Sequence, residues 1–127
     1  MPAIRKLTLI WNADSGALAG LADVAKKLAG VESCELCAIT HGALGERSRW
    51  RECRASLAVP VEALHRDDVP PELAALVQQR MPCVVASLDD RSLILVDPAQ
   101  IAACHGDPEA LTAAIRARAA DQGLTLA

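Results

Sequence analysis

Met81-Pro82-Cys83-Val84-Val85-Ala86 is the stretch that decides the fold of this 127-residue chain. A proline stands at the start of a run of β-branched and small apolar residues, and the first residue of a strand is one of the few places where a sheet tolerates proline. A second run of strand formers follows at residues 92–96, after the turn-forming sequence Asp89-Asp90-Arg91. The sequence therefore predicts an antiparallel hairpin of strands 83–88 and 92–96.

Two helices are expected after this hairpin. Asp97-Pro98 and Asp107-Pro108 each combine a good N-cap residue with a proline suited to the first helical turn. The first helix is expected to run through Cys104 and the second to about Gln122, because a glycine follows soon after each.

Ahead of the hairpin, strand and helix patterns alternate. We predict strands at residues 7–11, 36–40 and 61–65, and helices at residues 18–28, 46–57 and 70–79. The run at 36–40 is continuously apolar, as in a strand that is covered on both faces. Trp50, Cys53 and Leu57 fall on one face of the second helix. The prediction is an α/β fold, βαβαβα followed by ββα, with a mixed sheet flanked by helices.

Length and composition narrow the class of protein. The length fits one domain, residues 1–127. Phe and Tyr are absent and Trp occurs twice, and the net charge is −3, so the chain offers neither stacking platforms nor a basic field for nucleic acid. No run approaches the roughly 20 apolar residues that span a bilayer. We therefore expect no nucleic-acid or membrane partner, and a cytoplasmic protein whose five cysteines are mostly free thiols.

The order of elements, with Pro82 at the start of the hairpin, resembles that of the thioredoxin-like superfamily over nearly the whole chain. The resemblance implies a single thioredoxin-like domain in which the bond before Pro82 is cis and faces the functional site. Thioredoxins carry a C-x-x-C dithiol after a core strand, and glutaredoxin-like members carry it after the first strand. The corresponding positions here are residues 40–44 and 12–15, and neither segment contains a cysteine.

The chain does contain one C-x-x-C sequence, Cys34-Glu35-Leu36-Cys37, ahead of the second predicted strand. Two cysteines at this spacing can form a reversible disulfide, one acting as nucleophile and the other as resolving thiol, or they can share a metal ion. Roughly 12 Å of predicted strand separates Cys37 from His41, which is too far for both to hold one ion. The alternative is that Cys37 is a small buried residue and Cys34 a surface thiol. The sequence identifies no metal and no cofactor.

A second candidate site surrounds Pro82. The resemblance places this proline beside the loop after the second strand, so that Thr40, His41, Pro82 and Cys83 form a binding site bordered by Met81. A neighbouring histidine would favour the thiolate form of Cys83. The alternative makes Cys83 an inward-facing strand residue, since free cysteine is among the most buried residue types.

Polar side chains gather at the predicted carboxyl ends of strands, where open α/β sheets bind ligands. They are Asn12, Asp14, Ser15, Thr40, His41, His65 and Asp67. Capping and turn formation explain such residues without any ligand. The phosphate-binding loop, the dinucleotide fingerprint and the nucleophile elbow are all absent from the sequence.

Functions from different classes fit these observations. The first is a thiol module that works by redox exchange or reversible metal binding through Cys34 and Cys37. The alternative is a non-catalytic domain that binds a protein or small-molecule partner and whose cysteines are structural. A third function, an enzyme with His41 or His65 as general base, lacks an identified nucleophile. No motif names a substrate.

Overall fold

The computed structural model describes residues 2–11, 35–42 and 45–126; within these ranges the side chains of residues 35, 37, 38, 41, 42, 45 and 46 lie outside the description. The main sheet consists of β2 (Lys6–Trp11), β5 (Val61–His65), β6 (Cys83–Ser87) and β7 (Ser92–Val96). Their spatial order is β5-β2-β6-β7. The predicted α/β class and the mixed sheet are confirmed.

The central strand β2 has a parallel neighbour on one side and an antiparallel neighbour on the other. β5 lies parallel to β2, and their last residues, His65 and Trp11, are opposite each other. β6 lies antiparallel to β2 with Cys83 opposite Ile10, and β7 pairs antiparallel with β6. The carboxyl ends of β2 and β5 and the start of β6 therefore meet at one edge of the sheet.

Most of the strands that the sequence predicts are present. The predictions at residues 7–11, 61–65 and 92–96 correspond to β2, β5 and β7, and the predicted strand at 83–88 is β6, one residue shorter. The peptide bond between Met81 and Pro82 is cis, as expected.

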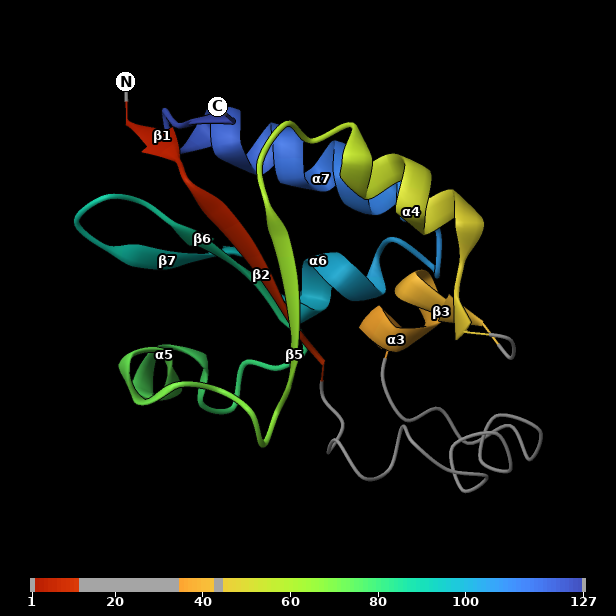
Figure 1. Cartoon of the computed structure of the whole chain (residues 1–127), viewed down its shortest axis with the longest axis horizontal. Helices are drawn as coiled ribbons and strands as arrows, with labels where there is room; N and C mark the ends of the chain where they lie inside the picture. The colour runs from red at the N-terminus through yellow and green to blue at the C-terminus, as the bar shows by residue number, and fades with distance from the viewer. Residues whose placement is uncertain (1, 12–34, 43–44, 127) are drawn as a thin grey trace.

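Helices cover both faces of the sheet, as Figure 1 shows. On one face, α4 (Ser48–Ala55) and α7 (Pro108–Asp121) pack with the larger core cluster, which includes Val84 and Ala86 of β6. On the other face, α5 (Pro71–Val77) packs with a smaller cluster that includes Cys83 and Val85. Successive residues of β6 thus belong to different cores, because side chains alternate between the two faces of a sheet.

The two helices that follow the hairpin begin where the sequence predicts. At the start of α6 (Pro98–Ala102), Gln100 N donates to Asp97 Oδ1 at 2.8 Å and Asp97 N donates to Gln100 Oε1 at 2.9 Å, which completes a capping box. At the start of α7, Glu109 N donates to Asp107 Oδ1 at 3.0 Å. The predicted ends differ slightly, since α6 ends at Ala102 rather than Cys104 and α7 ends at Asp121.

The predicted strand at residues 36–40 is wrong. These residues belong to the helix α3 (Glu35–Thr40), whose Leu36 and Ile39 are fully buried in the larger core. A short continuous apolar run has the same appearance in a buried strand and in a buried helix, and its periodicity cannot separate the two. Among the described residues, the main sheet therefore has four strands instead of the predicted five, and β5 is the second of them along the chain.

Other differences are smaller. The predicted helix at 46–57 is α4, and Trp50, Cys53 and Leu57 are buried as expected. The predicted helix at 70–79 is α5, which ends earlier, at Val77. The predicted helix at 18–28 lies outside the described residues.

Four two-residue strands have no counterpart in the predictions, because two residues are too few to produce a periodic pattern. β3 (His41–Gly42) pairs with β4 (Gly45–Glu46). β1 (Ala3–Ile4) lies parallel to β8 (Thr125–Leu126), so the first and last described strands lie side by side (Figure 1).

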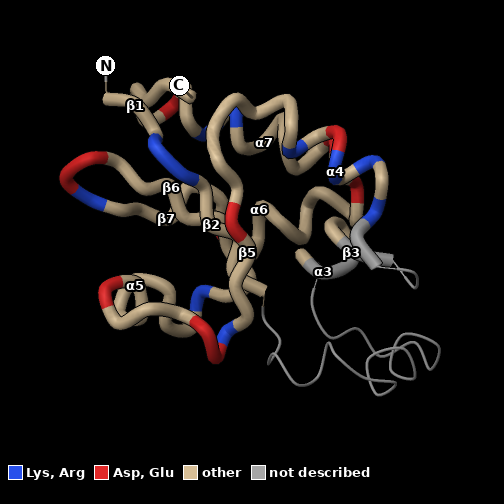
Figure 2. The backbone as a smooth tube through the Cα atoms, in the orientation of Figure 1, with Lys and Arg blue, Asp and Glu red and all other residues tan. Residues whose placement is uncertain are grey.

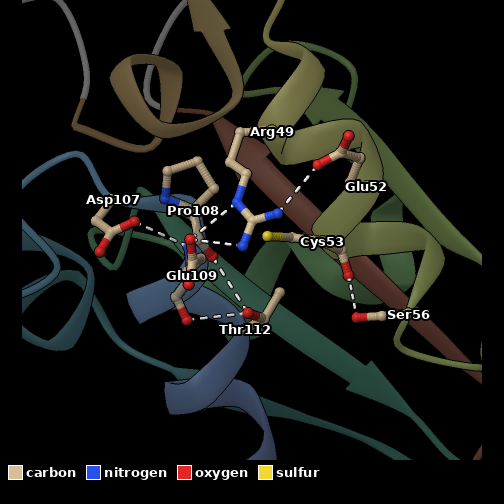
Figure 3. A network of polar contacts seen from close by, with 8 residues as sticks. All are labelled: Arg49, Glu52, Cys53, Ser56, Asp107, Pro108, Glu109 and Thr112. Atoms are coloured by element: carbon tan, nitrogen blue, oxygen red, sulfur yellow. Dashed lines mark hydrogen bonds and ion pairs between the residues drawn. The ribbon is translucent and has the colours of Figure 1, made fainter.

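A surface network joins α4 to α7, as Figure 3 shows. Arg49 Nε donates to Glu109 Oε1 at 2.9 Å, and its Nη1 donates to Glu52 Oε2 at 3.0 Å. The pKa of Arg49 is raised, first by its hydrogen bond to Glu109 and then by its bond to Glu52. All three side chains are exposed, so the network contributes little to stability beyond fixing how the two helices sit together.

Candidate functional site

The edge where β2 and β5 end forms the candidate site. Trp11 is the last residue of β2 and has 8% of its surface exposed. His65 lies opposite Trp11 on one side. On the other side, β6 begins at Cys83, which pairs with Ile10, so Pro82 precedes β6 near the end of β2. His65, Trp11 and Pro82 therefore lie at the same edge of the sheet, and we call these three residues the rim.

The imidazole of His65 is fixed from two sides. Its ring meets the Trp11 ring edge to face, with centroids 4.8 Å apart and planes inclined by 64°. Its Nδ1 lies 2.9 Å from Oδ2 of Asp68, in the turn that follows β5. The side chain remains 22% exposed. A carboxylate on one ring nitrogen fixes the tautomer and leaves the other nitrogen for a ligand or a proton.

An open hollow of about 500 Å³ lies on the α5 side of this edge. It is lined by Met81, by residues of α5 and by the turn before that helix, with Arg66 and Gln78 as its polar members. The hollow is open and largely apolar, and Met81, which borders the predicted site around Pro82, is among the residues that line it.

Cys83 is a core residue. It is fully buried and packs with Ile10, Leu73, Val77 and Val85 on the α5 face of the sheet. Burial raises the pKa of its thiol to about 12. A thiol with so high a pKa is protonated at neutral pH and is a poor nucleophile and metal ligand, because both roles need the thiolate.

The other two cysteines with described side chains are also buried. Cys53 lies in the larger core on α4. Cys104 donates its Sγ hydrogen to Gln100 O at 3.4 Å, and its pKa is raised by burial and then by the charge of Asp107. These thiols act as small apolar side chains, which is the commonest role of free cysteine.

Thr40 and His41 are not at the end of a strand of the main sheet. Thr40 is the last residue of α3, is fully buried, and its hydroxyl donates to Leu36 O at 3.3 Å. His41 begins the short strand β3. Because α3 packs with the larger core and Cys83 with the smaller one, α3 and the buried Cys83 lie on opposite faces of the sheet.

Of the Cys34 and Cys37 pair, only the backbone of Cys37 is described. Cys34 lies outside the described residues, and Cys37 is the third residue of α3, with its side chain outside the description. Asn12, Asp14 and Ser15, which the sequence places among the polar residues at strand ends, also lie outside the described residues. The assignment of chemistry to Cys34 and Cys37 stays a prediction.

Trp11 and Asp68 belong to the candidate site although sequence reasoning did not assign them to it. Asp68 stood in a polar cluster after the strand 61–65, and a carboxylate three residues after a histidine is a signal that can be searched for. The position of Trp11 could not be found in that way, because it depends on which strands are neighbours in the sheet.

Among residues 2–11, 35–42 and 45–126, no group of three or more His, Cys, Asp or Glu side chains is placed to hold a metal ion. No helix in this part of the chain combines the length and apolar character needed to cross a bilayer. Comparison of the chain with protein-family models, with curated proteins and with solved structures finds no match.

Proposed function

We propose that this chain is a thioredoxin-like thiol module that exchanges disulfides through Cys34 and Cys37. The observation that carries the proposal is the start of α3 at Glu35. The described part of the C-x-x-C sequence, residues 35–37, therefore belongs to a helix and does not lead into a strand. A C-x-x-C sequence in this setting, within an α/β chain, is typical of thiol–disulfide oxidoreductases, whose reactive thiolate has a lowered pKa.

The arrangement of strands supports the thioredoxin-like part of the proposal. The order β5-β2-β6-β7, with one parallel pair and a final antiparallel hairpin followed by a helix, agrees with the expected combination of a parallel half and a closing hairpin. Pro82 precedes the first strand of that hairpin, next to the end of β2. The thiol pair departs from the family pattern, because it lies far along the chain from β2.

The other three cysteines support, by elimination, the assignment of the reactive thiols to Cys34 and Cys37. Cys53, Cys83 and Cys104 are buried, and burial raises the pKa of the last two. Each therefore has a structural explanation that needs no chemistry. That leaves Cys34 and Cys37, whose side chains lie outside the described part of the chain, as the candidate pair.

The proposed reaction balances with a disulfide as co-reactant. One thiolate of the pair attacks a sulfur of the substrate disulfide, which forms a mixed disulfide and releases the first substrate thiol. The second cysteine then attacks the mixed disulfide, closes the Cys34–Cys37 bond and releases the second thiol. Two electrons and two protons pass from the pair to the substrate.

The test is an equilibrium of the reduced protein with mixtures of reduced and oxidised glutathione. We expect one intramolecular disulfide, which mass spectrometry of peptides assigns to Cys34 and Cys37, and which a C34S C37S variant does not form. A C104A variant is the matched control and keeps the disulfide. Formation of no disulfide, or of one that involves Cys53, Cys83 or Cys104, contradicts the proposal. Stoichiometric zinc on the purified protein would instead favour metal binding by the pair.

The geometry of the rim supports a second function, which is non-catalytic binding of a protein or small molecule. His65 is oriented by Asp68, packs on Trp11 and remains partly exposed, so it is ready to accept or donate a hydrogen bond at the edge of the sheet. This function needs neither Cys34 nor Cys37. Binding that survives in the C34S C37S variant and is lost in H65A would favour it.

A further inference from the structure

The hollow beside α5 adjoins the rim. Its volume is about 500 Å³, and two of its lining residues are chain neighbours of rim residues, since Arg66 follows His65 and Met81 precedes Pro82. The other described residues that line it belong to α5 or to the turns on either side of that helix; they are Val69, Pro71, Ala74, Ala75, Val77 and Gln78. Sites that bind small molecules have volumes of about 300–1,000 Å³, so the hollow is large enough for such a ligand.

The wall that α5 contributes to the hollow is apolar although it faces solvent. α5 buries Leu73 and Val77, whereas Ala74 and Ala75, which line the hollow, are exposed. The helix contains one charged residue, Glu72 in its first turn, as Figure 2 shows. A surface helix usually carries charged and polar side chains on its outer face. An exposed apolar wall of this kind favours a ligand with an apolar body.

Arg66 determines the charge that complements the hollow. Among the described residues that line it, Arg66 alone is charged, and Gln78 is the other polar one. Asp67 and Asp68 of the same turn are not among these lining residues, and Asp68 is directed to His65, with its Oδ2 2.9 Å from Nδ1. A guanidinium binds a carboxylate through two parallel N–H···O bonds. The complementary head group is therefore a carboxylate.

We propose that the hollow binds the anion of an unbranched aliphatic carboxylic acid, with the carboxylate at Arg66 and the chain against the apolar wall of α5 and Met81. Methionine is flexible, so this wall can adapt to chains of different length. None of the described lining residues is aromatic, and the hollow offers an aromatic ligand no ring to stack on. Neither Cys34 nor Cys37 enters the proposal, which goes beyond disulfide exchange and does not depend on it.

The experiment titrates hexanoate, octanoate and decanoate at neutral pH into the isotope-labelled protein and follows the binding by NMR. We expect saturable binding, with chemical-shift changes centred on residues 66–81. The affinity should rise about two- to fourfold for each added methylene group, because each one buries further apolar surface. Octylammonium has the same chain length and the opposite charge, and it should bind at least about threefold more weakly than octanoate.

Arg80 provides a matched control for Arg66. Both side chains are exposed, but Arg80 is not among the described residues that line the hollow. R66Q should weaken octanoate binding by about three- to fivefold, a size typical of an exposed charged pair, and should leave the gain per methylene unchanged. R80Q, which removes the same charge, should change the affinity by less than about twofold.

A74E tests the apolar wall. It places a carboxylate where the aliphatic chain should lie, and we expect it to weaken octanoate binding by at least about tenfold. Because Ala74 is exposed, the variant should fold normally, and its circular dichroism and urea midpoint check that it does.

Several results would overturn the proposal. These are one affinity for all three chain lengths, equal effects of R66Q and R80Q, unchanged binding in folded A74E, or shift changes centred outside residues 66–81. Absence of octanoate binding, together with a dimer that A74E converts to a monomer in sedimentation, would instead assign the hollow to a second copy of the chain. If octanoate binds as expected but no Cys34–Cys37 disulfide forms, the proposed function fails and this inference stands.

Discussion

At the scale of single residues, Cys83 shows how the surroundings decide what a thiol can do. It follows Pro82 at the edge of the sheet, where the sequence allowed either a binding-site thiol or an inward-facing strand residue, and the second is confirmed. The structure turns its side chain into the core beneath α5, where burial raises its pKa to about 12. The place of Cys83 at the start of a strand could be predicted from the sequence. The direction of its side chain depends on the register between β6 and β2.

The buried thiol of Cys83 should make the free energy of unfolding depend on pH in the alkaline range. The unfolded thiol ionises near its ordinary pKa of 9.0, whereas the folded thiol keeps its proton until about pH 12. The stabilisation is therefore complete below about pH 9 and is lost as the pH rises from there towards 12. Between pH 8 and pH 10, the free energy of unfolding should fall more steeply in the unchanged protein than in C83A, as measured by urea denaturation at each pH.

V85A is the control for this measurement. Val85 belongs to the same small core as Cys83 but carries no titratable group. Its truncation should lower stability at every pH and leave the slope of the unchanged protein. Equal slopes in C83A and the unchanged protein would show that Cys83 ionises freely and is not sealed in the core.

At the scale of elements, starts of helices could be predicted better than the type of a short apolar segment. Asp97-Pro98 and Asp107-Pro108 carry local signals, because a cap and a first-turn proline act on their own backbone. Residues 36–40 carry none, since an apolar run of five residues fits a strand and a buried helix equally well. Packing against the larger core decides in favour of α3.

The cap of α6 offers a direct test of this local signal. D97A removes the carboxylate that accepts from Gln100 N, and we expect it to lower the free energy of unfolding by about 1 kcal/mol. D90A, which alters an exposed residue in the turn between β6 and β7, is the control and should change stability by less than about 0.5 kcal/mol. Urea denaturation of both variants measures the difference, and an equal effect would mean that the capping box contributes no stability.

At the scale of the whole molecule, the candidate site could be predicted only in part. The α/β class, the hairpin and the position of Pro82 before its first strand follow from local patterns. The neighbours of Pro82 do not, because they depend on which strand pairs with β6 in the sheet. The misassigned segment led us to expect Thr40 and His41 at the end of a strand of the main sheet, whereas the strands that end there are β2, at Trp11, and β5, at His65.

The proposal divides the five cysteines into a reactive pair and a buried set of three. The burial of Cys53, Cys83 and Cys104 rests on both cores of the sheet, so the division is a property of the whole fold. If the division is correct, reagents for thiols should distinguish the two classes in the native protein without any knowledge of the substrate.

The most direct measurement is the alkylation rate of each cysteine in the native, reduced protein, followed by peptide mass spectrometry. The account predicts rapid modification of Cys34 and Cys37, with Cys53, Cys83 and Cys104 modified only after urea unfolds the chain. Rapid native modification of any of those three, or protection of both Cys34 and Cys37, would contradict it.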